Sequence, residues 1–345
     1  MRQVAVKLLV LLVSILLALT LGEQLLRLVG YRYRPVSIDV GNTEDARYYH
    51  LFGSDHFVHD PDLIWKPRPG RDVFNAEGFR GPLMGSSKSP GRLRIVTIGD
   101  SNTLGWAGPD GPNWPEALGR LLDAREIAAD VVNGGVWGYS SLQGLARLRQ
   151  VLVHDPDVVL VSFGSNDAVQ VAIPDRRFAG KSEQRRRLER WFNYYRLGQL
   201  TTAAVNASRR GGASQAPRVS LAEYRANLRQ MIDLSVAQGV QLVFLTRPFE
   251  LQIPDDVWWK NFGYDYNLAT GAIAAEAGIP LVDFYSHFKG RREYFADESH
   301  FTAEGHELAA RIVLAELGPL LGTAKKPPGK ASRKARGRAA TNPRG

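Results

Sequence analysis

From Arg92 onward the sequence alternates short apolar runs with amphipathic stretches, and this alternation restricts the fold more than any other feature. Five runs rich in Val, Ile and Leu are predicted strands: 93–99, 130–133, 157–164, 241–248 and 279–284. The stretches that follow them have the apolar spacing of helices: 113–129, 141–154, 220–239, 264–278 and 302–317. Apolar strands that alternate with helices predict a parallel sheet covered by helices on both faces. Ligands of such sheets bind beyond the carboxyl ends of the strands.

Polar residues suited to nucleophilic catalysis stand at those strand ends. Ser101 directly follows the first run, Gly138 and Asn166 follow the second and third, and Asp297 and His300 precede the last helix. A serine hydrolase needs a base for the hydroxyl proton, a carboxylate that orients the base, and donors for the oxyanion. We therefore predict Ser101 as nucleophile, His300 as base and Asp297 as the orienting carboxylate. The backbone N–H groups of Ser101 and Gly138 and the side-chain amide of Asn166 are the predicted oxyanion hole.

With these residues the chain resembles the SGNH hydrolases, also called GDSL-type esterases. Their four blocks are matched in order by GDSN, NGGVWGYSS, GSND and DESH, over about residues 92–317. The resemblance implies a flavodoxin-like, doubly wound three-layer αβα fold and ester hydrolysis with neither metal nor cofactor. Two positions depart from the usual pattern. Asn102 replaces the leucine of GDSL, and Trp137 precedes Gly138 where a small residue or proline is common, so we expect Trp137 to narrow the acyl pocket.

The amino end carries an apolar run from Val4 to Gly22 that only Lys7 interrupts. As a helix its 19 residues are about 28 Å long, close to the ~30 Å hydrocarbon core of a bilayer. A poor cleavage pattern favours a single-pass signal anchor with the catalytic domain outside the cytoplasm. A cleaved signal peptide, which leaves a secreted or periplasmic protein, and a buried core helix are the alternatives.

Composition along the chain predicts four parts. They are an anchor with its juxtamembrane segment at 1–35, an extended lead-in at 36–90 that packs on the catalytic domain, a hydrolase domain at 91–322, and a basic tail at 323–345. Within the hydrolase domain, residues 172–220 fit no strand–helix unit and are a predicted insertion. This insertion could serve as a lid, as a partner surface or only as a solvated helix. Four polar residues of the lead-in are more typical of turns than of a metal site: His56, His59, Asp60 and Asp62.

The net charge of +9 comes almost entirely from the tail. Residues 323–345 contain eight basic residues and no acidic one, so the rest of the chain carries about +1. A tail of this composition is expected to be disordered and to keep the protein soluble, with contact to anionic lipid, wall polymer or nucleic acid as the alternatives. We therefore predict no specific nucleic-acid partner.

An aromatic-rich segment follows the fourth predicted strand and falls on the rim of the predicted site. It contains Trp258 and Trp259, which with Trp137 are the predicted substrate contacts. Aromatic faces stack on sugars or pack against acyl chains. An outward-facing esterase with this rim predicts O-acetyl groups of an envelope or extracellular polysaccharide as substrate. An O-acyltransferase with the same triad and a non-catalytic polysaccharide-binding or assembly protein are the alternatives.

Overall fold

The structure is a computed structural model of the 345-residue chain. The residues it describes are 2–31, 57–60, 62–71, 73–85, 88–105, 111–171, 174–177, 179, 183–210, 216–249 and 263–323. Trp258, Trp259 and His56 lie outside these residues, as does the tail beyond Thr323.

A five-stranded parallel sheet forms the centre of the molecule, as the alternation predicts. Its strands are β3 (Leu93–Gly99), β4 (Ala129–Asn133), β5 (Val158–Ser162), β8 (Gln241–Leu245) and β9 (Leu281–Val282). They pair in the order β4-β3-β5-β8-β9, and every pair is parallel. Counted along the chain this order is 2-1-3-4-5, the flavodoxin-like doubly wound arrangement. All carboxyl ends therefore face one edge.

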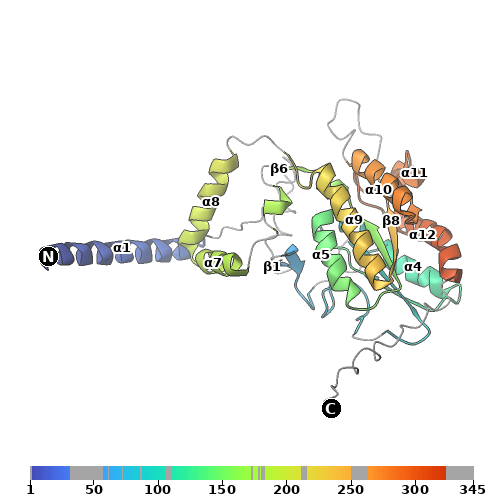
Figure 1. Cartoon of the computed structure of the whole chain (residues 1–345), viewed down its shortest axis with the longest axis horizontal. Coiled ribbons are helices and arrows are strands. Elements are labelled where there is room, and N and C mark those ends of the chain that lie inside the picture. Colours follow the sequence, from blue (N-terminus) through green and yellow to red (C-terminus); the bar gives the residue numbers. More distant parts are fainter. Residues whose placement is uncertain are drawn as a thin grey trace, which may run out of the picture.

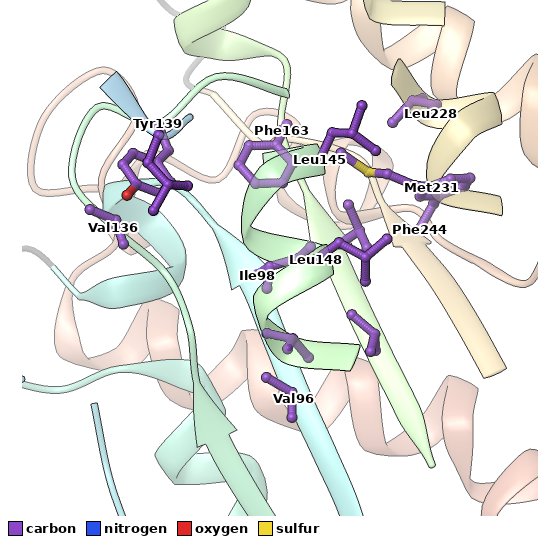
Figure 2. Packing of buried hydrophobic residues seen from close by; sticks show 14 of the residues in the cluster. Val96, Ile98, Val136, Tyr139, Leu145, Leu148, Phe163, Leu228, Met231 and Phe244 are labelled. Atoms are coloured by element: carbon purple, nitrogen blue, oxygen red, sulfur yellow. The ribbon is translucent and has the colours of Figure 1, made fainter. Parts of the chain in front are cut away.

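Helices cover both faces of the sheet and complete the three layers. One face carries α5 (Ser141–Leu152), α9 (Leu221–Gln238) and α10 (Tyr264–Ala277), and the other carries α4 (Trp114–Asp123) and α12 (Ala303–Thr323). Side chains alternate between the two cores, so Val96 and Ile98 pack under α5 whereas Ile95 packs under α4 and α12. Figure 2 shows the first core, where Leu148 and Met231 meet the sheet.

The helix ends follow from local chemistry. Ser220 and Glu223 form a capping box at the start of α9, and Gly239 ends that helix in a left-handed conformation. Two elements differ from expectation. The strand predicted at 279–284 is short, because Asp283 accepts from the N–H of Ser286 and begins α11 (Phe284–Phe288). Within the insertion, the stretch KSEQRRRLERWFNYYRLGQL (181–200) has the composition of one basic helix, but the structure forms two helices there, with a corner at Tyr195.

The lead-in supplies a hairpin that packs on the α5 face. β1 (Phe57–Asp60) pairs antiparallel with β2 (Ile64–Pro67), and Asp60 closes the turn by accepting from the N–H groups of Asp62 and Leu63. Leu63 and Trp65 are buried in the same core as α5.

Three long helices of the described chain lie outside the three layers (Figure 1). They are α1 (Arg2–Leu28), α7 (Glu183–Tyr194) and α8 (Arg196–Arg210). The last two form the insertion between β6 (Gln170–Val171) and β7 (Ala216–Pro217), which pair antiparallel. By length and composition α1 is sufficient to cross a membrane, a property it shares with signal sequences.

Candidate active site

Ser101 stands where β3 ends, at the first position of the short helix α3 (Ser101–Leu104). Asp100 caps that helix by accepting from the N–H of Asn102 at 2.9 Å. Gly99 allows the turn, because a Cβ there would lie 2.8 Å from the carbonyl oxygen of Ser162. The strand and the cap together fix the Ser101 hydroxyl at the carboxyl edge of the sheet.

The structure brings Ser101, His300 and Asp297 together in one hydrogen-bonded row. Ser101 Oγ lies 2.8 Å from His300 Nε2, and His300 Nδ1 lies 2.6 Å from Asp297 Oδ2. Ser101 and His300 are buried, whereas Asp297 is partly exposed. A hydroxyl, an imidazole and a carboxylate in this order can activate the hydroxyl as a nucleophile.

Asp297 is held as a carboxylate. Burial raises its pKa, but hydrogen bonds from the His300 side chain and from the N–H groups of Ser299 and His300 outweigh burial and lower the pKa to about 2. Both backbone N–H groups reach Asp297 Oδ1 at 2.8 Å. The carboxylate is therefore charged and oriented at neutral pH.

Asn102 is a site residue whose role the sequence did not reveal. Its Nδ2 donates to the carbonyl of Ser299 at 3.0 Å, and its Oδ1 accepts from the N–H of Phe301 at 3.3 Å. Asn102 is therefore hydrogen-bonded to both residues that flank His300. The sequence pointed to Asn102 only through its departure from GDSL. A leucine at this position could not form these hydrogen bonds.

Asn166 links the two other predicted oxyanion segments. It lies on α6 (Ser165–Ala168) after β5, and its Nδ2 donates to the carbonyl of Tyr139 at 3.1 Å and lies 3.4 Å from Asp100 Oδ2. Tyr139 is the neighbour of Gly138, and Asp100 is the neighbour of Ser101. Ser101, Gly138 and Asn166 therefore come from loops that meet at one place.

Two buried arginines support these loops, and nothing in the sequence pattern singled them out. Arg247 Nε donates to Asp100 Oδ2 at 2.9 Å, and both side chains are fully buried. Arg218 Nη1 donates to the carbonyl of Gly138 at 2.8 Å, while its Nη2 pairs with Asp175 at 2.8 Å. Because one partner left alone would be an unpaired buried charge, both ion pairs constrain the loops strongly.

Trp137 lies beside Gly138 but is buried. Its ring packs edge-to-face against Phe57 and Phe74, with centroids 6.0 and 6.2 Å away, so the lead-in hairpin region covers it.

His306, which follows His300 by six residues, is also buried, and its ring packs on Phe301. Burial lowers the pKa of His306 to about 3, and coulombic interactions with His300 and Arg80 act in the same direction. A neutral packed ring fits a structural role.

Within the described part of the chain, no cluster of three or more His, Cys, Asp or Glu side chains could hold a metal ion. Asp60 instead pairs with Lys66, with Lys66 Nζ 3.1 Å from Asp60 Oδ2.

Over part of its length the chain is similar to known esterases and thioesterases. An arylesterase of Vibrio mimicus is 35% identical over 86 residues, which cover 25% of this chain and 43% of that protein. Thioesterase 1/protease 1/lysophospholipase L1 of Escherichia coli (strain K12) is 36% identical over 77 residues, which cover 22% of this chain and 36% of that protein. The chain thus matches less than half the length of these relatives.

Among solved structures, a lipase/acylhydrolase from Enterococcus faecalis aligns with 20% identity and a TM-score of 0.46, over 66% of this chain and 96% of that chain. An acetylxylan esterase from Geobacillus stearothermophilus aligns with 22% identity and a TM-score of 0.46, over 66% of this chain and 94% of that chain. Residues 97–308, more than half of the sequence, match the GDSL-like lipase/acylhydrolase family. The chain therefore belongs to the GDSL-like lipase/acylhydrolase family.

Proposed function

We propose that the protein is a serine esterase that hydrolyses carboxylic esters through an acyl-enzyme on Ser101. The observation that carries this proposal is the row Ser101–His300–Asp297, with contacts of 2.8 and 2.6 Å. Similarity to an arylesterase supports the same reaction class. An intact row of this kind counts against a non-catalytic binding protein.

In this mechanism His300 Nε2 takes the proton of Ser101 as Oγ attacks the ester carbonyl carbon. The tetrahedral intermediate collapses, the bond to the alcohol oxygen breaks, and His300 returns the proton to the leaving alcohol. Water then attacks the acyl-enzyme by the same route and releases the acid. Asp297, ionised because of its lowered pKa, stabilises the imidazolium that forms in each step.

The developing oxyanion would be stabilised by the N–H groups of Ser101 and Gly138 and by the amide of Asn166. Removal of one such donor typically reduces kcat by about 10²–10³-fold. The hydrogen bond from Arg218 to the Gly138 carbonyl supports this assignment, because it restrains the peptide next to the proposed donor.

For the substrate we propose acetyl esters of an extracytoplasmic carbohydrate, with α1 as a single-pass anchor. The apolar length of α1 supports the location, although a cleaved signal sequence would place the domain in the same compartment. A ring cluster of Phe249, Tyr264 and Tyr285 supports an aromatic rim, with centroids 5.1 and 5.4 Å apart. In the sequence, Phe249 and Tyr264 stand on either side of the segment that contains Trp258 and Trp259. In this proposal 91–322 remains the hydrolase domain, with 172–220 inserted.

The test is hydrolysis of p-nitrophenyl acetate by the full chain in detergent, beside Ser101→Ala. We expect kcat to fall by on the order of 10⁴-fold or more in the variant, because the nucleophile is gone. Equal rates for both proteins would refute the serine mechanism. Acetyl transfer to an added sugar that outpaces hydrolysis would identify an O-acyltransferase instead.

A further inference from the structure

The most exposed aromatic side chains of the described chain are gathered at the carboxyl end of α7. Trp191, Phe192, Tyr194 and Tyr195 have exposed fractions of 61, 40, 69 and 41%, and no other described aromatic is as exposed. Leu188, 63% exposed, lies one turn before Trp191 on the same side of the helix. Exposed apolar surface of this kind marks a site of interaction.

This surface lies directly beside the end of α1. The N–H of Leu197, at the start of α8, donates to Glu23 Oε2 at 3.0 Å, and Arg27 Nε donates to Glu23 Oε1 at 2.7 Å. The Arg27 guanidinium lies 5.9 Å from the centre of the Tyr194 ring. Figure 1 shows α7 and α8 at the end of α1 that faces the sheet.

The position of Glu23 relates this contact to a membrane. It directly follows the apolar run that ends at Gly22, so in a membrane-spanning α1 it marks the border of the hydrocarbon core. Residues packed on Glu23 would then lie at the level of the lipid headgroups. Trp and Tyr are enriched at this level in membrane proteins because their rings are apolar and their N–H or O–H groups are polar.

The charge of the two helices suits an anionic surface. The sequences of α7 and α8 together contain seven arginines and two glutamates, a net charge of +5. Basic residues close to a bilayer are attracted to anionic headgroups. The body of the chain outside the tail is nearly neutral by comparison.

We infer that α7 and α8 form an interfacial helix pair that lies in the headgroup layer of an anionic phospholipid bilayer beside α1. This inference rests on the proposed membrane anchor. The pair joins the catalytic layers through β6 and β7, between Asn166 on one side and Arg218 on the other. Arg218 holds the Gly138 carbonyl, so lipid contact would orient the rim of the active site relative to the membrane.

Site-specific labelling tests this arrangement directly. The chain contains no cysteine, so single-cysteine variants of the full chain carry one environment-sensitive fluorophore each. The variants are Leu188→Cys on α7, Leu12→Cys on α1, and Val236→Cys on α9 as a matched exposed control. Each labelled protein is reconstituted into phosphatidylcholine–phosphatidylglycerol vesicles, and quenching by lipids with shallow or deep spin labels is measured.

We expect quenching by shallow labels at residue 188, quenching by deep labels at residue 12, and neither at residue 236. Quenching at 12 with a response at 188 no greater than at 236 would overturn the interfacial helix pair and leave the anchor standing. No quenching at 12 or 188 would overturn both. Ester hydrolysis by the same samples is measured in parallel and reports separately on the triad.

Discussion

At the scale of single residues, the active site depends on hydrogen bonds between positions far apart in the chain. Asn102 and Ser299 are 197 residues apart, and Asp100 and Arg247 are 147 apart. Such contacts hold His300 and the Ser101 loop at fixed positions. Small displacements of reacting groups are costly, so residues that never touch substrate still influence kcat.

Asn102→Leu tests this positioning role. Leucine cannot replace the hydrogen bonds to Ser299 and Phe301, so we expect kcat to fall roughly 10–100-fold while KM changes little. Steady-state kinetics with p-nitrophenyl acetate measure both constants. Asn227→Leu, which removes a buried hydrogen bond to Ser141 instead, is the control for general destabilisation. An equal loss of kcat in both variants would contradict a specific role for Asn102.

Asp167 makes stability depend on pH. It is fully buried, and burial raises its pKa to about 7 although Ser141 donates to it from Oγ and N–H. The folded protein therefore keeps a proton that the unfolded chain releases near pH 4. By linkage, this contribution to stability is complete below pH 4 and is lost as the pH rises through about 7.

Asp167→Asn removes this titration while it keeps an acceptor for Ser141. From pH 5 to pH 8 we expect the urea midpoint of the natural protein to fall more than that of the variant, because only the natural protein loses the contribution of protonated Asp167. Urea unfolding at both pH values, followed by circular dichroism, measures the difference. If the midpoints of the two proteins change equally between the two pH values, Asp167 is not protonated in the folded state.

At the scale of elements, close approach of helices to the sheet decides where small residues are required. Gly144 of α5 faces Phe163, and a Cβ there would lie 2.3 Å from a ring carbon. Gly119 of α4 has space for a methyl group, because a Cβ there would lie 3.7 Å from the nearest atoms, two side-chain carbons of Val131. The two positions form a natural pair for substitution.

Gly144→Ala should lower the free energy of unfolding by about 1–3 kcal/mol, because the new methyl group overpacks the contact with Phe163. Gly119→Ala should raise it by up to about 1 kcal/mol, because alanine favours helix more than glycine does. Chemical denaturation of both variants measures the two effects. A neutral Gly144→Ala would mean that α5 can shift away from the sheet.

At the scale of the whole molecule, positive charge and catalysis are separated along the chain. The tail after Gly322 contains eight basic residues, whereas the triad lies in the nearly neutral remainder. Ending the chain at Gly322 should therefore lower the salt concentration needed to elute it from a cation exchanger and leave ester hydrolysis unchanged. Elution at an unchanged salt concentration would assign the basic character to another surface.

The features that the sequence determined are those carried by local patterns. Five apolar runs separated by helical spacing were sufficient to predict the parallel sheet and its two helical layers. Asp297 and His300 are three residues apart, so one turn brings them together and their pairing could be read from the sequence. The ends of α9 were equally local, since Ser220 and Gly239 carry their own capping chemistry.

Only the tertiary structure decided which distant residues support the site. The sequence could not indicate that Arg247 pairs with Asp100, that Arg218 holds Gly138, or that Asn102 grips the loop of His300, because each pairing depends on how the strands are ordered. Trp137 and Glu23 show the same limit: the first packs under the lead-in hairpin region and the second caps α8. Periodicity along a chain fixes which face of an element is buried, whereas the partner of that face depends on the packing of the whole fold.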